Sequence, residues 1–345
     1  MPAWRQGIAV GEWRQIPNTA MSAAPMAVKT YPTLGTTGPE SKVIAWTGFA
    51  LDTRDSSIYS AANGGHNDYA GNEVNRIRLS ENAPAWTEPL ASTSPAQIVS
   101  GATHYADGRP SSRHSCYGEV VNEQRDRVMI LGGSRYSTNG SNLSTVDGFN
   151  LGSASWDAAA TYPDGLDLSS VYCPGIVEQK STGDIFVFAT WNVIRWKNAS
   201  NTWTRELVGT TAYGQYAATA HDSRRDRILI VGGTANDHAI YTPATKSLQS
   251  VTFTGLGAGV LAGDGNGMVY DPQLDAYLLR KPAAGSTVYR IDAQTFDVSV
   301  LTSSGGTNVP SAQNGVWKRF LYVPALKGTV YVPSYGDSIW FLRTN

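Results

Sequence analysis

Short apolar runs recur along the chain, and each begins from a similar seven-residue pattern. The pattern is two free positions, a small residue, three mostly apolar residues and a polar residue. Its six copies read WTGFALD (46–52), CYGEVVN (116–122), CPGIVEQ (173–179), YAATAHD (216–222), GNGMVYD (265–271) and QNGVWKR (313–319). Repeats of roughly 40–50 residues that contain strands indicate a β-propeller.

Each copy is followed by a polar turn and then by further predicted strands. The turns are rich in Asp, Asn and Pro, which favour tight reversals. The sixth unit stops at Asn345 after its third strand, and the segment around Trp13 has the missing pattern. We therefore predict an all-β fold: a six-bladed β-propeller of four-stranded antiparallel blades, closed by an N-terminal strand that pairs with the C-terminal blade.

The length is compatible with one domain, because six four-stranded blades use all 345 residues. We expect a single propeller domain over residues 1–345. Its predicted parts are the closing strand of blade 6 (8–17), blade 1 (46–90), blade 2 (113–158), blade 3 (171–208), blade 4 (213–254), blade 5 (263–302) and blade 6 (312–345).

Paired glycines end three of the predicted second strands, and a tryptophan marks the predicted fourth strand in three units. The residues are Gly64-Gly65 with Trp86, Gly132-Gly133 with Trp156, and Gly232-Gly233 with a tryptophan of the preceding blade, Trp203. This arrangement resembles the kelch repeat from about residue 46 onward, although three units lack the double glycine. The strings GGHNDYAGNEV and SRHSCYGEVV also look like ones in largely uncharacterised kelch-like proteins of bacteria and their phages. The resemblance implies a propeller and little about activity, because kelch-type propellers include binding modules and enzymes.

Charge and hydropathy exclude two classes of partner. The chain has 27 basic and 28 acidic residues and no run of Lys or Arg, so nucleic acid is not an expected partner. No stretch of about 18 apolar residues is present, so we expect no membrane span. The N-terminus lacks an apolar signal core. Three origins stay open: a cytoplasmic protein, a virion or extracellular protein that leaves by another route, or a chain whose signal peptide was removed.

Cys116 and Cys173 occupy equivalent positions in neighbouring blades. A disulfide requires Cα atoms within about 7 Å, and equivalent positions of inner strands that splay around a channel are expected to exceed that distance. We therefore expect two free, buried thiols, with a disulfide as the alternative. A catalytic cysteine assisted by His114 is a further alternative.

The unusual chemistry gathers in loops predicted to lie on one face. The connections 18–45 and 92–112 are longer than a bare link requires, and long loops on a rigid scaffold often carry function. Candidate residues in this face are His66, Asn67, Asp68, Tyr69, Arg113, His114, Arg135, Tyr136, Trp191, Asn192, Asn236, Asp237 and His238.

These residue types suit a glycan. A tryptophan such as Trp191 stacks on a sugar ring, while Arg and Asn donors bind hydroxyls or a carboxylate. Structural roles stand beside these: Asp68 caps a turn, Arg113 and His114 tie blades together, and Trp191 packs under a loop. His221 is expected to be structural, on the plain face, and the role of His104 is open.

Metal and cofactor sites are not expected. The sequence has no HxxxH, CxxC or clustered carboxylates, and the glycine-rich stretch 255–267 lies between strands with no helix to receive a phosphate. A nucleophile-elbow motif for a serine hydrolase is also missing. A copper radical oxidase would need a tyrosine crosslinked to a cysteine together with two histidine ligands. Cys116 and Tyr117 do not meet this need, because adjacent residues of a strand point to opposite faces.

Two functions follow from this pattern. We favour a recognition module that binds a polysaccharide, a cell-surface glycan or a protein surface, in the setting of a phage tail or with other virion proteins. The alternative is a polysaccharide lyase that cleaves a uronate polymer by β-elimination. In a lyase, Arg113 and Arg135 would neutralise the carboxylate, and His66, His114 or Tyr136 would transfer protons.

Overall fold

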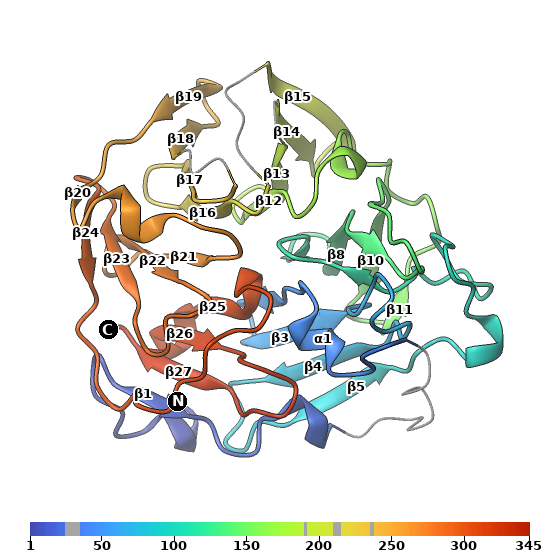
Figure 1. The fold of residues 1–345 in the computed structure, drawn as a ribbon, viewed down its shortest axis with the longest axis horizontal. Helices are drawn as coiled ribbons and strands as arrows, with labels where there is room; N and C mark the ends of the chain where they lie inside the picture. Colours follow the sequence, from blue (N-terminus) through green and yellow to red (C-terminus); the bar gives the residue numbers. More distant parts are fainter. Residues whose placement is uncertain (25–34, 190–191, 210–214, 235–237) are drawn as a thin grey trace.

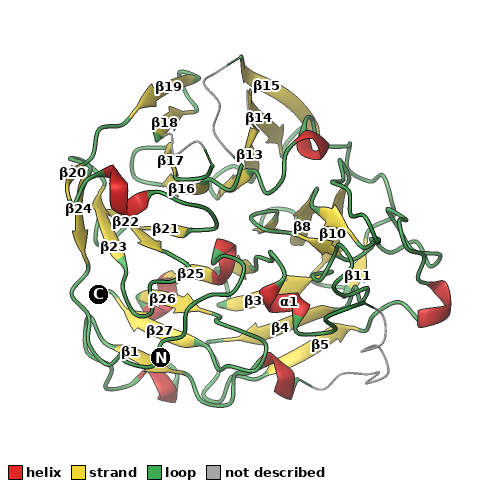
Figure 2. Ribbon diagram, in the orientation of Figure 1, coloured by secondary structure: helices red, strands yellow, loops and turns green. Residues whose placement is uncertain are grey.

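The structure, a computed structural model, describes residues 1–24, 35–189, 192–209, 215–234 and 238–345. Six antiparallel sheets are arranged around a central axis (Figure 1), which confirms the predicted six-bladed propeller. Helices contribute only short turns between the strands (Figure 2). None of the helices in the described ranges is long and apolar enough to cross a membrane.

The first three blades each contain four strands, numbered outward from the axis. Blade 1 consists of β2 (Ala50–Asp52), β3 (Ser57–Ala61), β4 (Val74–Arg78) and β5 (Trp86–Leu90). Blade 2 consists of β7 (Glu119–Asn122), β8 (Arg127–Leu131), β10 (Val146–Asn150) and β11 (Ser155–Trp156). Blade 3 consists of β12 (Gly175–Gln179), β13 (Asp184–Ala189), β14 (Asn192–Lys197) and β15 (Thr202–Val208).

The remaining blades follow the same plan with one addition. Blade 4 consists of β16 (Ala218–Asp222), β17 (Arg227–Val231), β18 (Ala239–Thr242) and β19 (Ser247–Ser250). Blade 5 consists of β21 (Gly267–Asp271), β22 (Ala276–Arg280), β23 (Tyr289–Asp292) and β24 (Asp297–Val300), with β20 (Thr254–Gly255) added in parallel to β24. Blade 6 consists of β25 (Phe320–Val323), β26 (Gly328–Tyr331), β27 (Trp340–Arg343) and the N-terminal β1 (Trp13–Gln15).

The predicted closure of the ring by the N-terminal strand is confirmed. In β1, Trp13 pairs with Leu342 and Gln15 pairs with Trp340 of β27, in antiparallel register. Trp13 is only 2% exposed and its indole N–H donates to the backbone oxygen of Ser286 at 3.0 Å. The two ends of the chain therefore share one blade, which leaves no open strand edge at the junction.

The turns after the inner strands are stabilised by the polar residue that ends each repeat. In blade 1, the backbone N–H of Arg54 donates to Oδ1 of Asp52 at 3.0 Å. The same bond recurs between Arg125 and Asn122, between Arg224 and Asp222, and between Gln273 and Asp271. These Asx-type turns explain why Asp or Asn follows the apolar run in four blades.

The sixth copy of the repeat begins four residues later than predicted. The inner strand of blade 6 is β25, so the segment equivalent to WTGFALD is WKRFLYV (317–323) and not QNGVWKR. Arg319 stands where the other copies have a small residue. Its side chain is fully buried and its guanidinium donates to the backbone oxygens of Val332, Pro333, Gln313 and Gly315. The arginine hid the copy from a search for a small residue.

Short helices and one ribbon complete the fold. The short helices are α1 (Ser41–Ile44) and the 3-10 turns η1 (Ala3–Arg5), η2 (Met21–Ala23), η4 (Pro95–Gln97), η5 (Leu168–Ser170), η6 (Ala258–Leu261), η7 (Trp317–Arg319) and η8 (Pro324–Leu326). A two-stranded ribbon of β6 (Arg113–His114) and β9 (Ser134–Arg135) lies beside blade 2. The core consists of apolar residues packed between adjacent blades.

Candidate functional site

Six equivalent residues, one from each blade, form a ring around the axis just before the inner strands. All six have φ between 47° and 71°. They are Trp46, Cys116, Cys173, Tyr216, Gly265 and Trp317. Backbone hydrogen bonds join them in pairs, from Cys116 to Trp46, from Tyr216 to Cys173 and from Trp317 to Gly265. Bulky residues adopt positive φ only where the surroundings hold them there, so the ring is a specialised part of the fold.

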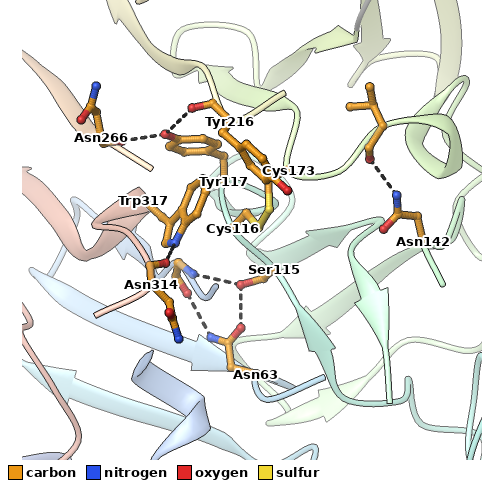
Figure 3. Close-up of a disulfide and its surroundings, with 12 residues drawn as sticks. Asn63, Ser115, Cys116, Tyr117, Asn142, Cys173, Tyr216, Asn266, Asn314 and Trp317 are labelled. Atoms are coloured by element: carbon orange, nitrogen blue, oxygen red, sulfur yellow. Dashed lines mark hydrogen bonds between the residues drawn. A yellow bond between two sulfur atoms is a disulfide. The ribbon is translucent and has the colours of Figure 1, made fainter. Parts of the chain in front are cut away.

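The expectation of two free thiols is wrong, because Cys116 and Cys173 form a disulfide (Figure 3). Their Cα atoms are 5.3 Å apart, within the range that a bridge requires. The expectation took both residues as ordinary members of splayed strands. Positive φ instead turns the chain toward the axis before each strand begins, where neighbouring blades are closest. The bridge joins blades 2 and 3 and leaves neither sulfur available as a nucleophile.

Aromatic rings pack next to the disulfide and fill the centre of the propeller (Figure 3). The ring of Trp317 lies 5.1 Å from that of Tyr117 and 5.6 Å from that of Tyr216, centroid to centroid. The hydroxyl of Tyr117 donates to the backbone oxygen of Asn266 at 2.6 Å. Separate cavities lie on the two sides of this aromatic layer, one at each end of the channel.

The cavity on the loop-rich side has a volume of about 210 Å³ and is called the loop-face cavity below. It is lined by Trp46, His66, His114, Ser115, Leu131, Gly133, Ser134, Asn142, Tyr172, Cys173, Pro174, Ile176 and Tyr216. Trp46 is 38% exposed and Tyr172 is 51% exposed, which is unusual for such large rings. The cavity therefore combines accessible aromatic faces with imidazole, amide and hydroxyl groups.

His114 is the polar centre of the loop-face cavity. Its Nε2 donates to Oδ2 of Asp68 at 2.8 Å, and its ring lies 5.2 Å from the ring of Trp46. Burial lowers the pKa of His114, and the Asp68 carboxylate opposes that effect. Burial alone would raise the pKa of Asp68, but hydrogen bonds from His114 and from Thr37 hold it below its usual value. The imidazole is thus neutral and fixed in orientation at neutral pH.

The second histidine, His66, follows the double glycine of blade 1. Its ring centroid lies 5.7 Å from that of His114. A Cβ on Gly65 would lie 2.1 Å from the backbone nitrogen of His114, so only glycine permits this approach. Gly140 faces His66 in the same way, because a Cβ there would overlap the imidazole ring. Glycines therefore bring the two histidines to the same side of the cavity.

Arg113 points away from the cavity and is fully buried. Its Nη2 pairs with Oδ2 of Asp147 at 2.9 Å, and Nη1 donates to the oxygen of Gly132 at 3.1 Å and to Thr145. The other carboxylate oxygen of Asp147 contacts Nε2 of His104 at 2.7 Å. These side-chain partners of Arg113 all belong to blade 2, so Arg113 has a structural role but does not tie adjacent blades together through its side chain. The contact with Asp147 also gives His104 a place in the fold.

The other candidate residues lie outside the lining of the loop-face cavity. Tyr69 is fully buried with its hydroxyl on Glu73, and Asn192 donates to Asp167. The His238 ring packs against Phe253 and its Nδ1 accepts a hydrogen bond from Gly232. Asn67, Arg135 and Tyr136 are half-buried neighbours of the lining. The remaining candidates, Trp191, Asn236 and Asp237, lie outside the described residues.

Three lining aromatics were missed by reasoning from the sequence. Trp46 and Tyr216 are each the first residue of a repeat copy, a position treated as free in the pattern. Tyr172 directly precedes the first residue of another copy. Comparing the first positions of the six copies found in the sequence would have pointed to two of the three rings, because four of those positions carry a cysteine or an aromatic residue.

The comparisons with known proteins leave the site to be interpreted on its own chemistry. Within the described parts of the chain, no three His, Cys, Asp or Glu residues are grouped so that they could hold a metal ion. No model of a known protein family matches the chain, and no curated protein sequence matches it.

Proposed function

We propose that the protein is a carbohydrate-recognition propeller and that the loop-face cavity holds one neutral sugar residue of a polysaccharide or cell-surface glycan. The observation that carries the proposal is the pair of exposed rings, Trp46 and Tyr172, in the lining of a small cavity that also has imidazole, amide and hydroxyl groups. Aromatic faces bind the apolar side of a sugar ring, and a few fixed polar groups select its hydroxyls.

The polar groups of the cavity are better suited to binding the hydroxyl groups of a sugar than to binding a charged group. Asn142 already donates one amide hydrogen to the oxygen of Val171 at 3.1 Å (Figure 3), and its side chain is thereby held in place. The His114 imidazole is oriented by Asp68. At about 210 Å³ the cavity is smaller than the ~300–1,000 Å³ typical of sites for drug-sized ligands. One ring at the end or branch of a glycan fits that size.

The hypothesis of a host-binding component of a phage particle belongs to the same proposal. A rigid propeller with one decorated face presents a fixed site to a surface, as attachment requires. The kelch resemblance supports the propeller scaffold in this proposal and does not select the ligand.

A glycan array is the direct test, followed by calorimetric titration with the best ligand. We expect Trp46→Ala and Tyr172→Ala to weaken binding by roughly 10- to 100-fold, as the loss of stacking on one ring would do. Val300→Ala is the matched control, since Val300 is an exposed apolar residue at the end of β24 in blade 5, outside the cavity lining. Binding of a glycan that is unchanged in both aromatic variants would reject the loop-face cavity as its site.

The lyase is a second candidate, supported by the histidine pair. His66 and His114 are close enough to act on one bound ring, and Asp68 orients His114 as it would orient a general base. The lining contains neither lysine nor arginine among the residues that the structure describes, and Arg113 is already paired with Asp147. A uronate carboxylate in this cavity would therefore meet no lysine or arginine among the lining residues, which favours recognition over β-elimination.

Incubation with acidic polysaccharides separates the two functions. A recognition propeller leaves polymer length and ultraviolet absorbance unchanged. Shortened chains with new absorbance from unsaturated uronate would establish a lyase, and His114→Gln should then abolish turnover while the protein stays folded. Recognition predicts that the same variant affects binding alone.

A further inference from the structure

The opposite end of the channel holds a second and larger cavity, of about 410 Å³, called the turn-face cavity below. Tyr117 and Trp317 of the aromatic layer line it at one end, and it reaches the turns after the inner strands, where Thr53, Ser223 and Pro272 line it. Its acidic and basic lining residues are Glu119, Glu178, Lys180, His221 and Lys318. This concentration of charged groups was not expected, because the sequence pointed to the other face.

We propose that Lys318 is the reactive amine of a second ligand site in the turn-face cavity, where it condenses with the carbonyl group of a small aldehyde or ketone. The first support is the position of the side chain. Lys318 follows Trp317 in the axial ring, lines the cavity, and donates one hydrogen bond, to the backbone oxygen of Glu119 at 2.8 Å. Within the described residues no carboxylate forms an ion pair with its nitrogen.

Lys180 lines the same cavity and shows the contrast. Its nitrogen contacts Oε2 of Glu178 at 2.7 Å, the oxygen of Val121 at 2.8 Å and Oε1 of Glu123 at 3.3 Å. Three acceptors use all three ammonium hydrogens, as in a structural lysine. The single acceptor at Lys318 leaves its nitrogen available to a ligand.

The electrostatic environment supports a nucleophilic amine. Burial lowers the pKa of Lys318 to about 7, and Lys180 acts in the same direction, while Glu178 and Glu119 oppose them. An ordinary lysine has a pKa near 10.4, so Lys318 has roughly a thousandfold larger neutral fraction at pH 7. The neutral amine is the form that attacks a carbonyl carbon, and a desolvated lysine is the usual way to supply it.

The condensation is balanced by groups already in the cavity. The lone pair of Nζ forms a C–N bond as the π bond of the carbonyl group breaks, and nitrogen gives up one proton while the carbonyl oxygen takes one, which yields a carbinolamine. The hydroxyl then leaves as water after a second protonation, and nitrogen gives up its second proton once the C=N bond has formed. Burial raises the pKa values of Glu119 and Glu178, so their carboxyl groups can donate and recover the protons.

The walls define the class of ligand. Phe49, Tyr117, Tyr270 and Trp317 line the cavity together with aliphatic residues such as Val120 and Met268. An apolar or aromatic body with one carbonyl group fits these walls, whereas a second charged group would face the carboxyl groups. The expected ligand is therefore an uncharged aldehyde or ketone with a small hydrophobic body.

Reductive trapping tests this site on the intact chain of 345 residues. Benzaldehyde with sodium cyanoborohydride at pH 7 converts an imine into a stable secondary amine, which peptide mass spectrometry locates. We expect Lys318 to be labelled at least about tenfold faster than the exposed Lys327, given the difference in neutral fraction. Raising the pH toward 10 should reduce this preference, because the exposed lysine then becomes neutral too.

Two variants make the test specific. Lys318→Arg should remove the fast adduct, and Lys180→Arg, in the same cavity, should keep it. The ratio of the labelling rates of Lys318 and Lys327 is measured in the wild-type protein, so it tests the proposal even where Lys318→Arg fails to fold. Equal labelling of the two lysines in wild-type protein at pH 7 overturns the proposal, as does a fast adduct that survives Lys318→Arg.

Discussion

The guanidinium of Arg113 and the carboxylate of Asp147 form a buried ion pair, with 2.9 Å between Nη2 and Oδ2. The next residue, His114, points the other way and lines the loop-face cavity. Two adjacent residues of one short strand therefore have separate tasks, because side chains alternate along a strand. Arg113 stabilises the scaffold, and His114 faces the proposed ligand.

Replacement of Arg113 by Met should therefore lower stability rather than act on the ligand directly. The change removes the guanidinium and leaves the buried Asp147 carboxylate with His104 alone. Breaking a buried ion pair in this way typically costs about 3–5 kcal/mol in the free energy of unfolding. Urea denaturation followed by tryptophan fluorescence measures this. Arg205→Ala is the control, since its pair with Asp167 is exposed and solvent screens it. An Arg113 variant as stable as the control would contradict this role.

The disulfide should contribute substantially to stability. Cys116 and Cys173 are 57 residues apart, and closing a loop of that length in the unfolded chain corresponds to about 4 kcal/mol in a chain-entropy estimate. We expect reduction, or the double change Cys116→Ser with Cys173→Ser, to lower the free energy of unfolding by an amount of this order. Thiol labelling under denaturing conditions should find no free thiol before reduction and two afterwards.

The sequence was sufficient for the architecture because propeller blades repeat. Apolar runs, Asx turns and the match between Trp13 and the incomplete last blade together predicted six blades and their closure. A fold built from repeated units can be predicted in this way, since each copy supports the others. The search for a pattern shared by all copies also hid Arg319, because this residue stands in the last copy where the other copies have a small residue.

The site was less predictable, because it depends on backbone conformation that residue types do not show. Positive φ at Cys116 and Cys173 brings the sulfurs together, and nothing in the residues themselves indicates that conformation. His66, Asp68 and His114 were expected on the correct face, because glycine pairs and loop lengths mark it. Tyr69 and Arg113 are close to these residues in the sequence, but both are buried. The alternation of side chains along a strand could not predict this burial from segments of only two or three residues.

The Asp68–His114 pair predicts a distinctive histidine titration. Burial holds the pKa of His114 below its usual value, and the Asp68 carboxylate raises it from what burial alone would set. In Asp68→Asn the pKa of His114 should therefore fall further. NMR titration of the imidazole protons measures this, and single His→Gln variants assign the five histidines. A pKa that rises in Asp68→Asn would be incompatible with this electrostatic account.

The same pair predicts how stability depends on pH. The unfolded chain binds a proton at His114 near pH 6.5, while the folded protein resists it, so acidification below that value favours unfolding. Asp68 has a lowered pKa when folded, so its contribution is present above its unfolded value near 3.8 and is lost at lower pH. Denaturation midpoints measured from pH 7 to pH 4 should fall, and His114→Gln should flatten the upper part of this decline.

Replacing either of two tryptophans by alanine should distinguish a residue that stabilises the scaffold from a residue that binds the proposed ligand. Trp13 is buried in the closing strand, and Trp46 lies at the mouth of the loop-face cavity. Trp13→Ala removes the ring that anchors β1 to blade 6, and such core truncations typically cost about 3–5 kcal/mol. Trp46→Ala removes a partly exposed ring, so its effect on the free energy of unfolding should be clearly smaller.

The two variants should then have opposite effects on the midpoint of thermal unfolding and on glycan affinity. Trp13→Ala should lower the midpoint of thermal unfolding strongly and leave glycan affinity unchanged at a temperature where it is folded. Trp46→Ala should keep most of the stability and lose the affinity. If Trp46→Ala were the more destabilising change, the positive-φ ring would be chiefly a structural closure of the channel, and the stacking role proposed for Trp46 would have to be given up.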